Sequence, residues 1–207
     1  MTVPYRRTAA FTLVELLLVV VFVGIIAAVV LSRSEPQIAQ QLNAAAEVLA
    51  SDLEYARQLA IANNSRYKVV FRTSSGEYYL QHSGSNPALD VLPLHPYLKN
   101  SADAANKPIQ IGRFSDLPAI GGAVDLYLVE TASSGTTVTE VEFDTTGQAT
   151  GAQDVRIWLA AGQSTSRRYI PVTLIAATGM AVVGDVTDNA PKVAVTFVPL
   201  RGDTSGM

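Results

Sequence analysis

Hydrophobic positions are distributed very unevenly along the chain, and the densest run lies near the N-terminus. Residues 16–31 read LLLVVVFVGIIAAVVL, and Glu15 is the single charge between positions 11 and 32. At ~1.5 Å per residue, a helix over 11–32 reaches roughly 33 Å, enough for the ~30 Å hydrocarbon core of a bilayer. The pattern predicts one transmembrane helix, with Arg6 and Arg7 on the cytoplasmic side and the rest of the chain exported.

A second, amphipathic pattern follows the apolar run. Between positions 37 and 63, apolar side chains recur every three or four residues, which is the spacing of one helical face. They are Ile38, Leu42, Ala45, Leu49, Leu53, Ala56 and either Leu59 or Ala60. The opposite face, which we expect to be solvated, carries Gln40, Asn43, Glu47, Asp52, Glu54 and Arg57. We therefore predict an amphipathic helix over 33–64 that continues the apolar segment and ends at the Asn63-Asn64-Ser65 run.

The remaining sequence changes to short runs typical of β-strands. Tyr67–Arg72 and residues 77–81 flank the link Thr73-Ser74-Ser75-Gly76 and predict a hairpin. Further strands are predicted at 123–130, 138–143, 155–159, 169–176, 181–183 and 193–198, each bounded by Gly, Asp, Ser or Pro. The chain after position 65 is therefore expected to form one β-rich domain, 65–207.

A long excursion interrupts the predicted strands. Residues 83–116 are rich in Pro, Asn and Asp and predict a surface segment with one edge strand near 109–111. The order of elements, one long N-terminal helix followed by strands, predicts an α+β fold. In it, the amphipathic half of the helix packs Leu49 and Leu53 on a C-terminal antiparallel sheet.

Composition and charge narrow the possible functions. The 207 residues carry a net charge of −3, so no basic excess attracts a phosphate backbone, and nucleic acid is not an expected partner. The absence of cysteine excludes disulfides, thiolate metal sites and thiol nucleophiles. His82 and His95 lie in polar, loop-like surroundings and are expected at the surface. The sequence contains no G-x-S-x-G, H-E-x-x-H or P-loop motif, so we predict neither an enzyme nor a cofactor.

A weak candidate for metal binding lies near the C-terminus. Asp185, Asp188 and Asn189 could offer oxygen ligands to calcium. Three side chains in a turn-rich segment more often form Asx turns, and hard cations need six or more oxygens. No metal site is therefore predicted.

A weak candidate for nucleic-acid binding lies on the later strands. Arg167-Arg168 beside Tyr169, and Arg156 beside Trp158, could stack on single-stranded nucleic acid. Alternating strands commonly place arginine outward and the aromatic side chain inward. A solvated sheet face is therefore the preferred interpretation.

Three interpretations of the N-terminus compete. A secretory signal has its small-residue cleavage site after the apolar run, but residues 29–33 (VVLSR) lack such a site. A plain signal anchor accounts for the basic residues and the apolar helix but leaves Glu15 unexplained, unless it reaches the cytoplasmic headgroups. A carboxylate in a spanning helix costs roughly 2.5–3.5 kcal/mol near the bilayer centre and usually has a partner. The third interpretation is a leader that is cleaved before the apolar run.

The order of residues favours the third interpretation. RRTAA at 6–10, followed by FTLVEL at 11–16 and the apolar run, resembles the class III signal of type IV prepilins. The resemblance implies a leader over 1–10, cleavage by a prepilin peptidase between Ala10 and Phe11, and N-methylation at Phe11. It also implies that Glu15 neutralises the amino terminus of a neighbouring subunit during assembly. Ala10 departs from the glycine that this family usually has before the cut.

Three later segments sharpen this resemblance. LASDLEYARQLAIANNSRYK at 49–68, VEFDTTG at 141–147 and LIAATGMA at 174–181 are similar to the helix end, first strand and two turns of the GspH/FimT group. This group comprises the H-type minor pseudopilins of type II secretion and related minor pilins. No resemblance covers 83–123.

The family resemblance implies a pilin-like fold and a function in assembly. The implied role is that of a structural minor pseudopilin of a type II secretion system, built into a periplasmic pseudopilus for protein export. The alternative is a minor pilin of a type IV pilus or DNA-uptake system with a binding role. Implied partners are other pilin or pseudopilin subunits, the prepilin peptidase and the inner membrane. The implied location is a single pass through the inner membrane, with the C-terminal domain periplasmic or extracellular.

Overall fold

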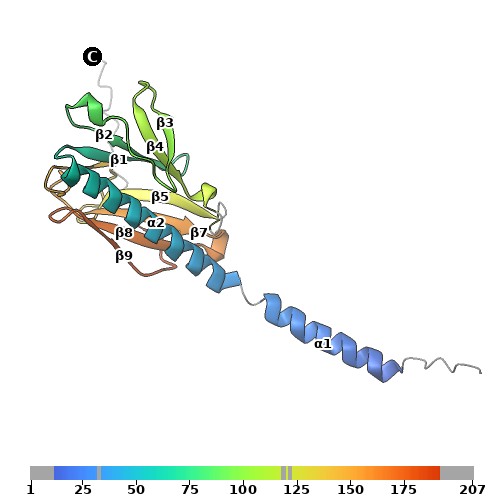
Figure 1. Ribbon diagram of the computed structural model, residues 1–207. Helices are drawn as coiled ribbons and strands as arrows, with labels where there is room; N and C mark the ends of the chain where they lie inside the picture. Colours follow the sequence, from blue (N-terminus) through green and yellow to red (C-terminus); the bar gives the residue numbers. More distant parts are fainter. Residues whose placement is uncertain (1–11, 32–33, 118–119, 121–122, 192–207) are drawn as a thin grey trace, which may run out of the picture. The chain divides into compact units, whose positions relative to one another are not determined.

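The chain separates into two units. The computed structural model describes residues 12–31, 34–117, 120 and 123–191, and its two units are Met1–Gln37 and Ile38–Met207. The first unit contains one helix and the first turn of a second helix, and the other unit contains the rest of the second helix and two antiparallel sheets, which Figure 1 shows. Ala10, Phe11 and the strand predicted at 193–198 lie outside the described residues.

The first unit contains α1 (Leu13–Leu31), which begins directly after Thr12. Apart from Glu15 and Gly24, every residue of α1 is aliphatic or aromatic, so the helix has no polar face. Within the residues that the structure describes, no helix is both long enough and apolar enough to cross a membrane.

The amphipathic pattern forms α2 (Ser34–Ala62). Its predicted apolar face is confirmed, because Leu49 and Leu53 have no exposed surface. The prediction that Asp52 is solvated is wrong, since only 3% of Asp52 is exposed. Asp52 lies three positions after Leu49 and four before Ala56, and this spacing places it inside the buried stripe.

The first sheet has five antiparallel strands. They are β1 (Tyr67–Arg72), β2 (Glu77–His82), β3 (Lys99–Ala102), β4 (Pro108–Arg113) and β6 (Glu140–Phe143), in the order β3-β4-β2-β1-β6. The predicted hairpin is confirmed, with Arg72 opposite Glu77. The prediction of an edge strand near 109–111 is wrong in its position, because β4 lies between β2 and β3. The strand at this edge of the sheet is β3. Its sequence, KNSA, has no hydrophobic pattern that would predict a strand.

The second sheet has four antiparallel strands. They are β5 (Val124–Thr131), β7 (Val155–Ala161), β8 (Arg168–Ile175) and β9 (Met180–Val183), in that spatial order. Short 3-10 helices lie at Pro87–Leu89, Phe114–Asp116 and Ser164–Ser166. β5 and β7 are long and closely paired, with one register shift between Leu126 and Leu128.

The core of the second unit lies between α2 and the two sheets. Leu49 and Leu53 of α2 belong to one buried cluster with Phe143 of the first sheet and Ile157 and Ile170 of the second. Figure 1 shows α2 lying along the strands of both sheets. The predicted packing of Leu49 and Leu53 on a sheet is therefore confirmed.

Candidate functional site

Glu15 lies in the first turn of α1, where the helix begins with a side-chain cap. The backbone N–H of Glu15 donates to the Thr12 hydroxyl at 3.2 Å, and the Leu16 N–H donates to the Thr12 carbonyl at 3.2 Å. Thr12-x-x-Glu15 has the spacing of a capping box, a signal that marks helix starts. A negative charge in the first turn also interacts favourably with the helix dipole. The carboxylate therefore has a local stabilising role besides the predicted role in assembly.

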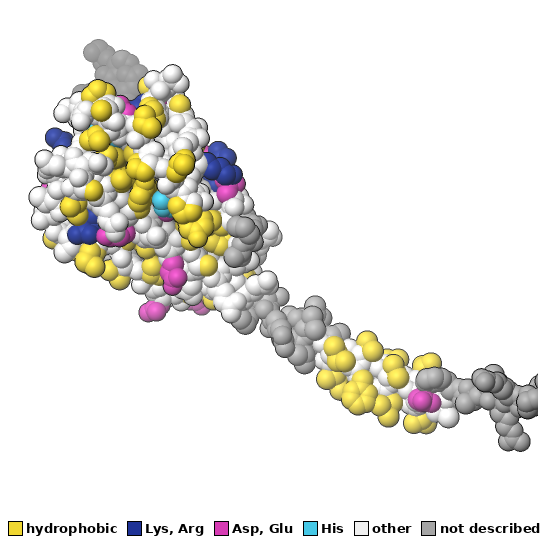
Figure 2. All heavy atoms as spheres, in the orientation of Figure 1, with side chains coloured by type: hydrophobic (Ala, Val, Ile, Leu, Met, Phe, Trp, Pro, Cys, Tyr) yellow, Lys and Arg dark blue, Asp and Glu magenta, His cyan; other side chains and the backbone are white. Residues whose placement is uncertain are grey.

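The described side chains of α1 leave a large apolar surface without cover. The large hydrophobic residues between Leu13 and Ile26 each expose at least half of their surface. The exposed fraction is 80% at Leu13 and 51% at Leu18. Figure 2 shows these apolar side chains along the described part of the helix. Removing apolar surface from water stabilises a protein by about 25 cal/mol per Å². Burial of this surface of α1 would therefore be favourable.

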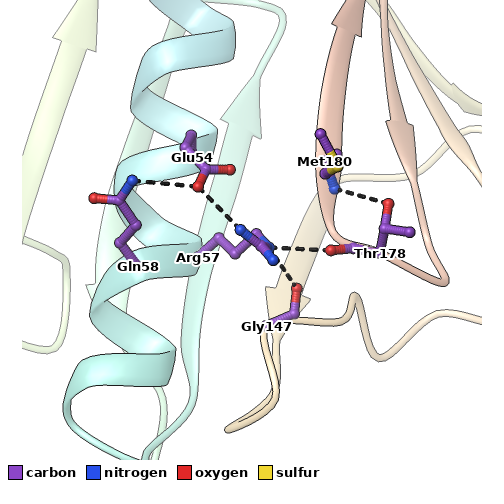
Figure 3. Close-up of polar contacts among 6 residues, drawn as sticks. All are labelled: Glu54, Arg57, Gln58, Gly147, Thr178 and Met180. Carbon is purple, nitrogen blue, oxygen red and sulfur yellow. Dashed lines mark hydrogen bonds and ion pairs between the residues drawn. The ribbon is translucent and has the colours of Figure 1, made fainter.

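Arg57 connects the second half of α2 to two turns that are distant in sequence. Its Nε donates to the Gly147 carbonyl at 3.2 Å and to the Thr178 carbonyl at 3.0 Å, as Figure 3 shows. Nη1 of Arg57 donates to Glu54 Oε1 at 3.0 Å. We call this set of contacts the Arg57 tether. It fixes the helix to one turn after β6 and to another between β8 and β9.

Two glycines make the Arg57 tether possible. Gly147 and Gly179 have φ angles of +83° and +67°, a backbone conformation that L side chains rarely adopt. A Cβ placed on Gly179 would lie 1.8 Å from the Gly147 carbonyl oxygen. The two turns therefore pack backbone to backbone beneath the guanidinium. These turns lie in two of the segments singled out in the sequence, 141–147 and 174–181.

His82 belongs to a hydrogen-bonded network that the sequence did not suggest. Its Nδ1 lies 2.7 Å from Asp90 Oδ1, and its Nε2 lies 2.7 Å from the Ser65 hydroxyl. An ionised carboxylate only accepts hydrogen bonds, so Nδ1 carries the proton, and in the neutral ring Nε2 accepts from Ser65. The hydrogen bond from His82 lowers the pKa of the Asp90 carboxyl. The prediction that His82 lies at the surface is wrong, because the side chain is fully buried.

The Ser65-His82-Asp90 network has the connectivity of a catalytic triad but lacks access. An open pocket of about 400 Å³ is lined by Ser65 and Gly84, whereas His82 does not line it. In a triad the imidazole must donate a proton to a leaving group, which requires an open face beside Nε2. A Cβ on Gly84 would lie 2.1 Å from the Ser65 hydroxyl, so the backbone of Gly84 covers this side. The geometry fits a structural role, in which hydrogen bonds through His82 connect Ser65, just before β1, to Asp90 in the 83–116 excursion.

Asp52 and His95 form a second buried polar cluster with Tyr78. The Tyr78 hydroxyl donates to Asp52 Oδ2 at 2.5 Å, and His95 Nε2 lies 3.6 Å from Asp52 Oδ1. Burial raises the pKa of the Asp52 carboxyl to about 6, although the hydrogen bond from Tyr78 lowers it. Burial also lowers the pKa of His95. His95 was expected at the surface, and this prediction is wrong, because only 11% of the side chain is exposed.

The register of the sheet could have revealed one of these clusters. The β1–β2 hairpin places Tyr67 opposite His82, so Ser65, two positions before Tyr67, must lie close to the imidazole. Asp52 likewise falls within the apolar period of α2. No comparable local signal marks Asp90 or His95, since both lie in the irregular excursion.

The weak metal candidates lie apart from these clusters. Asp185, Asp188 and Asn189 are in the segment after β9, and the Asn189 N–H donates to the Thr187 hydroxyl at 3.1 Å. Throughout the described part of the chain, no group of three or more His, Asp or Glu side chains could hold a metal ion.

The arginine and aromatic residues of the second sheet contact one another. The Arg156 guanidinium lies 5.7 Å from the centre of the Trp158 ring, and the indole N–H donates to Glu130 at 2.9 Å. Arg167 lies 5.9 Å from the ring of Tyr169, which is only 7% exposed. Rings engaged in this way fit a folded sheet face better than a platform for stacked bases.

Comparison with known proteins gives a distant structural likeness. No protein-family model matches the chain, and no curated protein matches it. Two crystal forms of the type IV minor pilin FimU from Pseudomonas aeruginosa are similar, each with 15% identity. They cover 74% and 73% of this chain and 95% and 98% of FimU, with TM-scores of 0.45 and 0.43. A likeness at this level leaves the function to be argued from the chain's own residues.

Proposed function

We propose that this chain is an assembly subunit of a pilin-type filament, and more specifically a minor pseudopilin of a type II secretion system. The observation that carries the proposal is the order of features at the N-terminus. Two arginines precede Ala10 and Phe11, and Glu15 follows in the first turn of an otherwise apolar helix. In this proposal a prepilin peptidase cuts between Ala10 and Phe11 and methylates the new amino group.

The proposal assigns residues 11–32 to the inner membrane before assembly and to a helical bundle afterwards. The uncovered apolar side chains of α1 support it, because either environment removes them from water. A carboxylate in such surroundings is stabilised when it meets a positive charge. We assign that charge to the Phe11 amino group of a neighbouring subunit, which makes Glu15 the residue that sets the register. The C-terminal domain is then periplasmic.

The second unit supports the proposal through the Arg57 tether. The three segments that resemble the GspH/FimT group, 49–68, 141–147 and 174–181, are distant in sequence, yet Arg57 joins them through Gly147 and Thr178. One side chain thus links all three segments, and it holds α2 to turns of both sheets.

Mass spectrometry of the mature N-terminus tests the processing step. The full-length chain is expressed in a host that carries a prepilin peptidase and is extracted from the membrane fraction. We expect a chain that begins at N-methylated Phe11. A chain that retains Met1 in the presence of active peptidase contradicts the proposal.

Two matched substitutions separate assembly from helix capping. Glu15→Gln removes the charge but keeps the backbone N–H that Thr12 accepts, whereas Thr12→Val removes the capping hydroxyl and keeps the charge. We expect Glu15→Gln to be cleaved and membrane-inserted but to lose crosslinking to partner subunits, and Thr12→Val to keep it. Normal assembly of Glu15→Gln defeats the assignment of Glu15.

Deletion of the gene distinguishes a type II secretion system from a type IV pilus or DNA-uptake system. Loss of protein secretion supports the pseudopilin, whereas loss of pili or of DNA uptake supports the minor pilin.

A further inference from the structure

An open polar pocket lies between the turn that joins β1 to β2 and the start of β5. Its volume of about 340 Å³ falls within the ~300–1,000 Å³ range of small-ligand sites. We call it the Arg167 pocket, and its lining consists of residues 73–76, Asp125, Leu126 and Tyr127 of β5, and Arg167, directly before β8. These residues differ from those of the Arg57 tether and of the two buried histidine clusters.

Two tyrosine rings hold the guanidinium of Arg167 in place. Its central carbon, Cζ, lies 5.1 Å from the ring centre of Tyr127 and 5.9 Å from that of Tyr169, which are cation–π distances. The two rings also contact each other edge to face, with their centres 5.2 Å apart. A side chain that is already fixed loses little conformational entropy when it binds a ligand. The pocket therefore contains a preorganised hydrogen-bond donor.

The hydrogen-bonding capacity of Arg167 is only partly used by its neighbours. Nη2 lies 3.8 Å from Asp125 Oδ2, a distance that is too long for a hydrogen bond. Nε is buried and has no hydrogen-bond partner among the described residues. The side chains of Arg167 and Asp125 are 35% and 71% exposed. The pocket thus presents a guanidinium and a carboxylate side by side, and both are accessible to a ligand.

This pair of charges determines which ligand chemistry fits. An anion drawn to Arg167 lies beside the Asp125 carboxylate, and a cation drawn to Asp125 lies beside the guanidinium, so each meets a like charge. A guanidinium only donates hydrogen bonds, and an ionised carboxylate only accepts them. A hydroxyl group does both. Two adjacent hydroxyls of one neutral ligand can therefore accept from Arg167 Nη2 and donate to Asp125 Oδ2.

The turn at 73–76 adds further groups that both donate and accept. Thr73, Ser74 and Ser75 are exposed, and all three line the pocket. The Ser75 hydroxyl donates to the Arg72 carbonyl at 3.4 Å, which leaves its oxygen free to accept from a ligand. A ligand with several hydroxyls on one ring can meet these groups and the Arg167–Asp125 pair at the same time.

We propose that the Arg167 pocket binds a neutral carbohydrate, with two adjacent sugar hydroxyls bridging Arg167 and Asp125 and others contacting the turn at 73–76. A neutral sugar meets no like charge in the pocket. Its ring fixes the hydroxyls relative to one another, so one binding event satisfies several polar groups. The proposal concerns the second unit and does not depend on the role of α1 in assembly.

Titration of the full-length chain with simple sugars, followed by NMR, tests the proposal. The chain is held in micelles of lauryldimethylamine oxide, a detergent without a sugar headgroup. D-glucose, D-galactose, D-mannose and N-acetyl-D-glucosamine are each added up to about 50 mM, because an open polar site is expected to bind with a dissociation constant on the order of 1 mM. We expect at least one sugar to shift the amide signals of Gly76 and Arg167 in a saturable way. The amide of Leu159 in β7 is expected to stay constant.

Two added compounds separate a sugar site from other kinds of site. Tetrahydropyran has the ring of a sugar without its hydroxyls, and we expect it to leave both signals unchanged. Sodium acetate tests for an anion site, and we expect no saturable shift, because Asp125 repels it. Four sugars that leave the Gly76 and Arg167 signals unchanged overturn the proposal, as does acetate that binds as tightly as the best sugar. These results come from the unaltered chain and do not depend on a variant folding.

Three variants identify the groups that bind. Arg167→Met removes the donor and Asp125→Ala removes the acceptor, and we expect each to weaken sugar binding at least about tenfold, since each loses a hydrogen bond to a charged group. Arg156→Met is the matched control, because Arg156 lies over an aromatic ring of the same sheet, 5.7 Å from the centre of Trp158. It is expected to keep the affinity of the unaltered chain. Unchanged binding in a folded Arg167→Met or Asp125→Ala chain overturns the proposal.

Discussion

Replacing Arg57 with methionine removes the tether between α2 and the two turns while keeping a side chain of similar length. The variant loses the guanidinium Nε–H, which is shared by the Gly147 and Thr178 carbonyls at 3.2 and 3.0 Å. Hydrogen bonds that involve a charged group contribute about 1.5–3 kcal/mol each. One N–H serves both acceptors here, and a quarter of the side chain is exposed, so water replaces part of the loss. We expect a cost of about 1.5–3 kcal/mol in total.

Equilibrium unfolding of the full-length chain in detergent measures this cost. For a chain of this size, each kcal/mol lowers the melting temperature by about 2–4 °C, so the expected decrease is about 3–12 °C. Glu54→Gln is the matched control, because it removes the ion pair with Arg57 and leaves the bonds to the turns. An ion pair at this spacing on an exposed helix contributes about 0.3–0.5 kcal/mol.

The comparison of the two variants decides whether the tether stabilises the domain. A change of less than about 0.5 kcal/mol in Arg57→Met means that solvent satisfies the two carbonyls as well as the guanidinium does. An equal cost in Glu54→Gln means that the ion pair, and not the bonds to the turns, carries the effect. Either result refutes the reasoning.

Two further substitutions test the packing around the tether. Gly179→Ala adds a Cβ that lies 1.8 Å from the Gly147 carbonyl oxygen at a φ of +67°, so the turns must separate; we expect a cost of at least about 2 kcal/mol in urea unfolding, and a stable variant would show that the turns move freely. Leu53→Ala empties a fully buried position on α2 and should cost about 2–5 kcal/mol by the same measurement; a cost below about 1 kcal/mol would show that the helix is not part of the core.

Much of the fold follows from patterns that depend on near neighbours in the sequence. The apolar period of α2 identified Leu49 and Leu53 as core residues because a helix repeats every 3.6 residues. The hairpin of β1 and β2 was found because four turn-forming residues separate two β-type runs. β3 could not be predicted, because it is stabilised by pairing with β4 and its own sequence, KNSA, contains no pattern that indicates this pairing.

The buried polar clusters were harder to predict for a physical reason. His82 and His95 lie among polar residues and prolines, a local setting that is typical of the surface. Their burial depends on Asp90 and Asp52, and a polar group enters a core only when such a partner is present. The fold determines which distant residues become partners, so the sequence alone could not predict the pairing of His82 with Asp90 or of His95 with Asp52. Asp52 was placed on the solvated face because its side chain is polar. Its position in the helical repeat, between Leu49 and Ala56, places it on the buried face.

The Arg57 tether also has a consequence for the time course of folding. Its two acceptors lie 90 and 121 positions after Arg57 in the sequence. At a synthesis rate of about 5–20 residues per second, the more distant acceptor is made roughly 6–24 s after the arginine. Contacts this far apart also slow folding, because a long loop must close before they form. In the growing chain, α2 is therefore complete well before either acceptor of its tether has been made.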